Sequence, residues 1–153
     1  MPTILLPVLH LSQRRQADCL AACAAMVITY LGKTVDYEHL MHILGIKHYG
    51  APSSNVTRLR EMGFRIRYSQ GSIADIEKHL AEDRPCIVFL RTRELPYWNV
   101  DTGHAAVVIG LDEANVYLND PAFESSPQIV PIGDFLLSWM EFDYDYAVID
   151  RRR

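Results

Sequence analysis

The chain of 153 residues is 49% hydrophobic and 22% charged, a balance that fits one globular domain over residues 1–153. Its net charge of −4 gives no basic footprint for nucleic acid, and no apolar run reaches the roughly 18 residues that a membrane span needs. The three cysteines, an odd number set in apolar runs, argue against a disulfide framework and favour a reducing, cytoplasmic compartment.

The N-terminal part of the chain predicts a strand followed by a buried helix. The segment from Ile4 to Leu9 is apolar, contains Pro7 and lacks a charged n-region, so we interpret it as an extended lead-in strand and not as a signal peptide. Asp18 is a candidate N-cap for a helix that runs to about Leu31, with Gly32 as the C-terminal stop. Apolar residues surround this helix, which indicates a central position in the core.

The remaining elements predict an α+β domain. Further helices are expected at Asp36–Leu44, Asn55–Met62, Ile73–Ala81 and Asp134–Met140. Strands are expected at Phe64–Tyr68, Cys86–Arg91, Ala105–Leu111, Val116–Leu118, Ile129–Pro131 and Tyr146–Ile149. The residues at 151–153 are all arginine and are expected to form a solvated tail. Helices first and strands later imply an N-terminal helical half packed on a C-terminal antiparallel sheet.

Cys19 has the position expected of a nucleophile. It follows the predicted cap, so its thiol lies at the first turn of the helix, where the positive end of the helix dipole stabilises a thiolate. Cys23 lies one turn later inside the helix, and Cys86 begins an apolar strand. We therefore interpret Cys23 and Cys86 as buried structural cysteines.

A histidine and an acid far downstream complete a candidate catalytic set. His104 follows a glycine at the start of an apolar strand and is the candidate base. Asp120 comes sixteen residues later, across a hairpin that could return the chain beside His104, where a carboxylate would orient the imidazole. Asn119 is an alternative orienter. Gln13 and Gln16 are both candidates for an amide donor to the oxyanion.

Other residues give weaker signals. His39 and His42 are three apart on a predicted helix, but no acid or cysteine accompanies them at ligand spacing, so no metal site is predicted. No phosphate-binding loop is present, so no cofactor is predicted. Tyr97 and Trp98, in the loop before the candidate base, either line a cleft or anchor the loop on the core.

Two segments carry a resemblance to a known family. QRRQADCLAACAAMVITYLG resembles the opening of the bacteriocin-processing cysteine peptidases, and GHAAVVIGLDEANVYLNDPA resembles their His and Asp segment. These papain-like domains cut double-glycine leader peptides, usually as the N-terminal part of an ABC exporter. LREMGFRIRY, RPCIVFL, FLLSW and YAVID also fit. The resemblance implies the papain-like fold, with Cys19 as nucleophile, His104 as base, Asp120 as orienter and Gln13, six residues before the cysteine, as oxyanion donor.

The resemblance also implies a peptide or leader-peptide substrate, with an ABC exporter as a candidate partner. Leu20 stands where the family usually has glycine, which would narrow or reshape the site near the scissile bond. The sequence stops at Arg153 before any membrane segment or ATPase half, so we expect an excised domain or a free-standing relative. Two alternatives stay open: a leader-peptide binding module with weak catalysis, and a papain-like acyltransferase.

Overall fold

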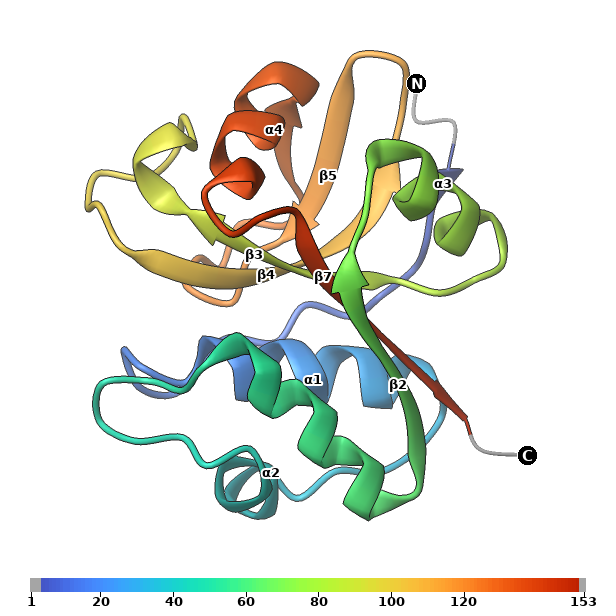
Figure 1. The fold of residues 1–153 in the computed structure, drawn as a ribbon, viewed down its shortest axis with the longest axis vertical. Helices are drawn as coiled ribbons and strands as arrows, with labels where there is room; N and C mark the ends of the chain where they lie inside the picture. Colours follow the sequence, from blue (N-terminus) through green and yellow to red (C-terminus); the bar gives the residue numbers. More distant parts are fainter. Residues whose placement is uncertain (1–3, 152–153) are drawn as a thin grey trace.

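A helical half and a sheet half meet along the helix α1 (Cys19–Tyr30), as Figure 1 shows for the computed structural model. The structure describes residues 4–151. Residues 1–3, before the predicted lead-in strand, and Arg152 and Arg153 of the predicted tail lie outside the described residues.

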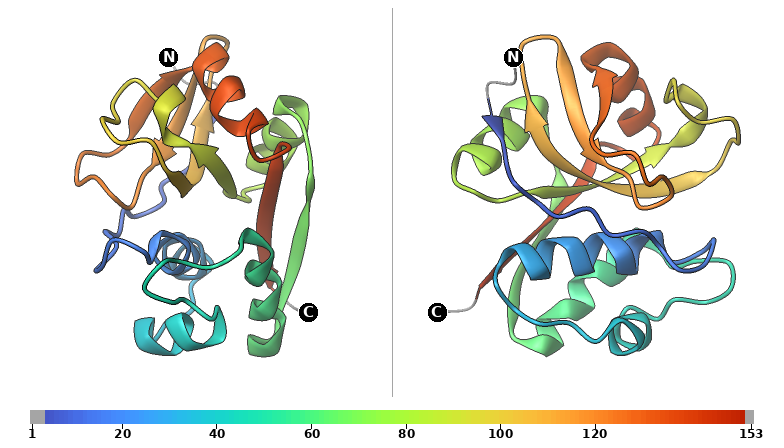
Figure 2. Two further views of the ribbon diagram at one scale, coloured as in Figure 1. Left: turned by 60° about the vertical axis from the view of Figure 1, so that its left-hand side comes forward. Right: turned by 180° about the vertical axis from the view of Figure 1, so that it is seen from behind.

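The helical half is built around α1. Nine of its residues, from Leu20 to Ile28, are buried, because its sequence is apolar on every side and neighbours cover all of them. The helix α2 (Tyr37–Ile43) begins at Asp36, whose carboxylate accepts two backbone N–H groups as an N-cap. A 3₁₀ helix, η1 (Ser53–Met62), ends at a glycine with φ 89°. Figure 2 shows α1 lying between α2 and the sheet.

The sheet half is antiparallel throughout, with the strand order β2–β7–β3–β4–β5–β6 and β1 added on β4. The strands are β1 (Ile4–Leu5), β2 (Phe64–Gln70), β3 (Cys86–Arg91), β4 (Gly103–Leu111), β5 (Asn115–Asn119), β6 (Gln128–Pro131) and β7 (Asp145–Arg151). The helices α3 (Ile73–Ala81) and α4 (Ile132–Met140) pack on this half, and a short 3₁₀ turn, η2 (Thr92–Glu94), follows β3.

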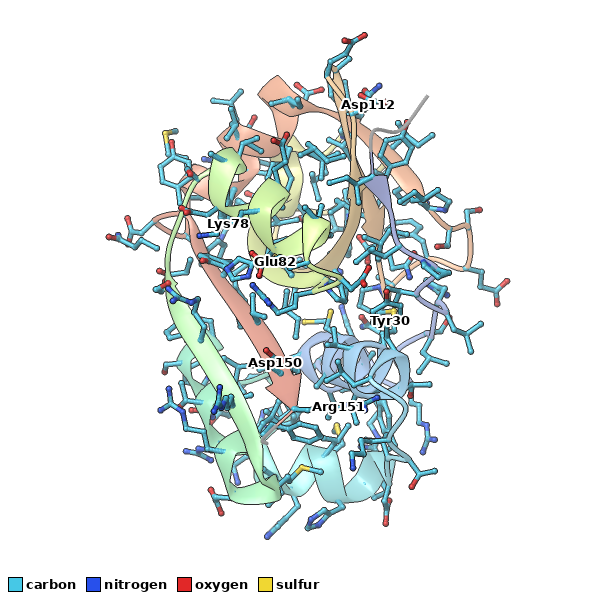
Figure 3. The ribbon with its side chains drawn as sticks, turned by 90° about the vertical axis from the view of Figure 1, so that its right-hand side faces the viewer. Tyr30, Lys78, Glu82, Asp112, Asp150 and Arg151 are labelled. Carbon is cyan, nitrogen blue, oxygen red and sulfur yellow. The ribbon has the colours of Figure 1, made fainter. Side chains whose placement is uncertain are left out.

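Two strand arrangements position the site. α1 packs across β4, so the start of the helix faces the start of a central strand that is almost wholly buried. β7 carries Asp150 and Arg151 from the sheet half down beside α1, as Figure 3 shows. Both halves therefore share strands, and the two walls of any cleft between them are tied together by β2 and β7.

The α+β architecture predicted from the sequence is confirmed, with four local differences. The helix predicted at Asn55–Met62 is a 3₁₀ helix. Only Ile4–Leu5 of the predicted lead-in strand pairs as a strand, because Pro7 has no N–H to donate. Arg151 belongs to β7, where it pairs with Phe64, and not to a tail.

The fourth difference concerns the predicted cap of α1. Asp18 does occupy the N-cap position, but its side chain accepts no hydrogen bond from the helix N–H groups among the described residues. Its carboxylate is fully buried and is held elsewhere.

Candidate active site

Cys19 is the first residue of α1 and is half-buried beside the imidazole of His104. In an α-helix the first N–H groups have no partner within the helix, so the start of α1 presents both unpaired donors and the positive end of its dipole to the thiol. The predicted position of Cys19 is therefore the one that the structure has.

His104 and Asp120 are hydrogen-bonded, as the hairpin argument predicted. His104 Nε2 lies 2.6 Å from Asp120 Oδ1, and both side chains are buried. With Nε2 engaged by the carboxylate, Nδ1 is the ring nitrogen left for Cys19. The order thiol, imidazole, carboxylate is that of a nucleophile, a base and an orienter.

The pKa values of the pair favour the charged forms. Burial lowers the pKa of His104, but the hydrogen bond that its ring donates to Asp120 and the adjacent Cys19 outweigh burial and raise that pKa to about 9. Burial raises the pKa of Asp120, yet hydrogen bonding to His104 and its charge keep that pKa below the usual value. At neutral pH the arrangement supports an imidazolium beside the thiol.

The other two cysteines are buried, as expected. Burial raises the pKa of Cys23 well above its usual value, with Cys19 and Asp120 adding to the effect. Burial likewise raises the pKa of Cys86 to about 12. All three cysteines carry free thiols, and Cys19 is the one that is not fully buried.

Two aromatic residues complete the surroundings of Asp120. Tyr97 Oη and Trp98 Nε1 both donate to Asp120 Oδ2, at 2.6 and 3.0 Å. The sequence left open whether these residues line a cleft or anchor a loop, and Trp98 does both. No periodic pattern or motif spacing in the sequence could have linked Trp98 to a carboxylate 22 residues away. With the amide of Ala122 on Oδ1, the carboxylate accepts four hydrogen bonds.

Asn119, the alternative orienter, points away from the imidazole. Its Nδ2 donates to the carbonyl of Val8, and its Oδ1 accepts from the hydroxyl of Ser126. In the same N-terminal segment as Val8, His10 Nε2 lies 2.8 Å from the backbone carbonyl of Asp120. Asn119 therefore ties the N-terminal segment to the end of β5, next to Asp120, and does not orient His104.

The two glutamines differ in a way the sequence could not resolve. Gln13 Nε2 donates to the carbonyls of Arg15 and Gln16, at 2.9 Å each. Both of its N–H groups are thus used within the turn, and its buried Oε1 has no hydrogen-bond partner among the described residues. Gln16 contributes its backbone carbonyl to this turn, and both glutamines line the cleft over Cys19.

A cleft of about 780 Å³ opens over the thiol and the imidazole. Its walls come from both halves and include Leu20, the loop 48–53, Phe89, Val100, Gly103 and Phe142. Phe142 lies close over Gly103, where an added Cβ would be 3.0 Å from the ring. Apolar side chains and a few polar ones thus line the cleft around Cys19, a surface that suits an extended peptide.

The family of the chain follows from a sequence comparison. A family model described as the Peptidase_C39 like family matches residues 5–146. This match spans most of the chain, so the chain belongs to the C39-like peptidase family, and the family resemblance inferred from the sequence is confirmed. Comparison with curated protein sequences finds no match.

Solved structures share the fold. A C39-like protein from Bacillus anthracis is 20% identical, with a TM-score of 0.80 over 99% of this chain and 98% of that chain. A double-glycine motif protease from an AMS/PCAT transporter, solved with its leader peptide, is 22% identical, with a TM-score of 0.76 over 97% and 95%. The peptidase domain of Streptococcus ComA, a bifunctional ABC transporter of a quorum-sensing pathway, is 17% identical, with a TM-score of 0.77 over 95% and 99%.

Among the described residues, no helix has both the length and the apolar character needed to cross a bilayer.

Proposed function

We propose that the chain is a cysteine peptidase in which Cys19, His104 and Asp120 form the triad. One observation carries the proposal. The Cys19 thiol lies at a helix start beside the imidazole of His104, and the Nε2 atom of that ring is hydrogen-bonded to the Asp120 carboxylate. This constellation suits acyl transfer through a thioester.

The reaction follows from these roles. Cys19 Sγ attacks the scissile carbonyl carbon while His104 holds the thiol proton, and the carbonyl oxygen becomes an oxyanion at the start of α1. The tetrahedral adduct collapses to a thioester as His104 gives the proton to the leaving amine. His104 then takes a proton from a water molecule, whose oxygen adds to the thioester carbonyl. Collapse of this second adduct releases the acid, and the departing Cys19 sulfur regains its proton from His104. Asp120 keeps the ring oriented and its charge stabilised throughout.

We assign Gln13 a part in the oxyanion site, beside the backbone N–H of Cys19. Its place in the cleft wall supports this role. Its Nε2 must release at least one of the two turn carbonyls to donate to an oxyanion. The role therefore requires a small rearrangement of the turn 13–16 when substrate binds.

The substrate that we propose is a peptide with small residues before the cut, in the first instance a leader ending in Gly-Gly. Leu20 next to the nucleophile and the Phe142 ring over Gly103 leave little room for side chains at the reacting carbonyl. Small residues supply little binding energy, so a longer leader segment must add affinity. The leader-peptide complex of the AMS/PCAT transporter protease supports this choice, and an exporter encoded nearby is the proposed partner.

The test compares peptides of increasing length upstream of a Gly-Gly pair, by kcat/KM, with Cys19→Ala as the inactive control. We expect the full leader to be cut far faster than a short Gly-Gly peptide, and Phe-Phe not to be cut. Equal rates for all peptides would reject the leader-peptidase assignment. A covalent adduct that passes to an added amine and not to water would assign an acyltransferase, and binding without an adduct would assign a binding module.

A further inference from the structure

Asp18, the residue before the nucleophile, is held away from the helix that it precedes. Its Oδ1 accepts the N–H of Arg15 at 2.8 Å, and its Oδ2 accepts the hydroxyl of Tyr37 at 2.7 Å and the N–H of Arg14 at 3.3 Å. The carboxylate is fully buried, so these three donors replace its contact with water. All of them lie outside α1.

This placement departs from what an aspartate at an N-cap ordinarily does. Such a side chain accepts the N–H of the second or third helical residue and sets a negative charge at the positive end of the helix. At α1 that arrangement would engage the N–H groups next to Cys19 and set a carboxylate against a thiolate. The observed geometry leaves those N–H groups without a side-chain cap.

Tyr37 is the donor that comes from a different element. It is the first residue of α2, and burial together with the hydrogen bond to Asp18 raises its pKa, so it remains a hydroxyl that can donate. The same helix start holds the turn before Cys19 at two further points. The Arg14 guanidinium lies 4.2 Å from the centroid of the Tyr37 ring, and Arg15 pairs with Glu38 at 2.9 Å.

We propose that Tyr37 is a positioning residue that holds the Asp18 carboxylate off the start of α1, which keeps the N–H groups beside Cys19 free for the oxyanion and the thiolate. The proposal rests on the peptidase function proposed above and adds a residue to its machinery. Tyr37 acts through Asp18 and does not touch the reacting atoms.

The proposal can be tested because few titratable groups lie near the Cys19 thiol and the Asp18 carboxylate. The titratable groups near Cys19 are His104 from β4, Asp120 behind that imidazole, and Cys23 one turn along α1. The groups near Asp18 are Tyr37 and the two arginines of the turn, with Glu38 paired to the second of these. Without the Tyr37 hydroxyl, the carboxylate is free to turn toward the uncapped N–H groups of the helix.

The experiment uses Tyr37→Phe, which removes one hydroxyl. We expect kcat to fall about tenfold, short of the roughly 100- to 1000-fold cost of deleting an oxyanion donor, with KM nearly unchanged. The pH profile of Cys19 alkylation by iodoacetamide should move to higher pH by roughly one unit, because a carboxylate approaches the thiolate. Tyr117→Phe is the matched control: it loses a 2.7 Å bond to Asp112, which lies at the end of the sheet half far from α1 (Figure 3), and both readouts should stay at the wild-type values.

The double variant Tyr37→Phe/Asp18→Asn isolates the charge. It lacks the same hydroxyl, so the effect of losing that hydroxyl on the fold is common to both variants, and their difference reports the change of the carboxylate to a neutral amide. We expect the alkylation profile to return toward that of the wild type. A Tyr37→Phe protein with wild-type kcat and alkylation profile would overturn the proposal, and so would a shift that persists in the double variant. If the wild type cuts no peptide, the peptidase assignment fails, while alkylation still tests Tyr37.

Discussion

The indole of Trp98 meets the imidazole of His104 edge to face, with ring centroids 4.8 Å apart and planes at 63°. The same indole donates its N–H to Asp120, so one side chain both covers the imidazole and donates a hydrogen bond to the carboxylate beside it. Water is thereby kept from the hydrogen bond between the imidazole and the carboxylate, which strengthens that bond electrostatically.

Trp98→Phe should therefore lower kcat by roughly tenfold or more, since it removes one charge-assisted hydrogen bond and keeps an aromatic cover. KM should change little, because the lost hydrogen bond goes to Asp120 and an aromatic ring still lines the cleft at this position. Tyr97→Phe removes the other donor to the same oxygen and should behave alike, with the double variant worse than either. Steady-state kinetics on one peptide decide this; a rise in KM without a fall in kcat would show that these rings bind substrate instead.

Alkylation should distinguish the three thiols. Cys19 is half-buried beside an imidazolium, whereas Cys23 and Cys86 are fully buried with pKa values raised by burial. Iodoacetamide at mildly acidic pH, followed by peptide mass mapping, should modify Cys19 at least about tenfold faster than the other two. Cys19→Ser should leave almost no labelling in the folded protein. Equal labelling of all three thiols would reject Cys19 as the nucleophile.

The pH dependence of activity should follow His104. Its pKa is raised to about 9, so the imidazolium that supports the thiolate is lost only as the pH rises through about 9, and activity should fall there. Asp120→Asn removes a cause of that raised pKa while burial still lowers it, so the alkaline limb should move down by roughly one unit or more. Rates of a single peptide across pH 5–10 provide the measurement.

The free energy of unfolding should also depend on pH through His104 and Asp120. Because the folded state raises the pKa of His104, the charged pair stabilises the fold fully below about pH 6.5, and this contribution disappears as the pH rises through about 9. Asp120 has a lowered pKa, so its contribution is present above pH 3.8 and is lost as the pH falls further. Urea unfolding at pH 6.5 and 9.5 should show a drop in the free energy of unfolding for the wild type and a much smaller one for His104→Gln.

Gln13→Ala should lower kcat by about 100-fold and raise KM less, because an oxyanion donor acts on the transition state. Gln16→Ala is the matched control. Its side chain is exposed and only its backbone carbonyl enters the turn, so we expect nearly wild-type rates. The reverse result would move the oxyanion role to Gln16. If Gln13→Ala lowers the free energy of unfolding enough to account for its loss of kcat, Gln13 serves the turn alone.

Gly103→Ala tests the wall of the cleft. The new methyl would sit 3.0 Å from the Phe142 ring, so the ring must move by a few tenths of an ångström, and this ring lines the cleft in which we propose that substrate binds. We expect KM to rise several-fold with unfolding little changed, and Phe142→Ala in the same chain to restore binding. If the double variant is no better than Gly103→Ala, the added methyl acts through the strand and not through the ring.

The fold was largely readable from the sequence because its signals are local. α1 is apolar on all sides, Asp36 and Ser72 cap their helices, and β3 was predicted with the bounds that it has. The Cys19 and His104 assignments followed from local position, and hairpin spacing predicted an acid beside His104, while the choice of Asp120 over Asn119 came from the family resemblance. These three are placed together by the structure, and their catalytic roles stay predictions.

What the sequence could not supply depends on contacts distant along the chain. Tyr97 and Trp98 reach Asp120 only because a loop after β3 folds over β5, and Tyr37 reaches Asp18 only because α2 packs on α1. Asp18 looked like a cap because its position is that of a cap, and tertiary donors then drew its carboxylate away. Patterns of residue type record which side chain precedes a helix, but not which partner competes for it.

The place of β7 in the sheet has a consequence for when the proposed site can assemble during synthesis. β7 is the last strand in the chain, yet it lies between β2 and β3 in the sheet, and the contact of His10 with Asp120 spans 110 residues. Such long-range pairings form late, after the chain that they join has been made. A nascent chain that has emerged only as far as α1 thus lacks both His104 and Asp120, and the proposed site can assemble around Cys19 only after β4 and β5 have been made.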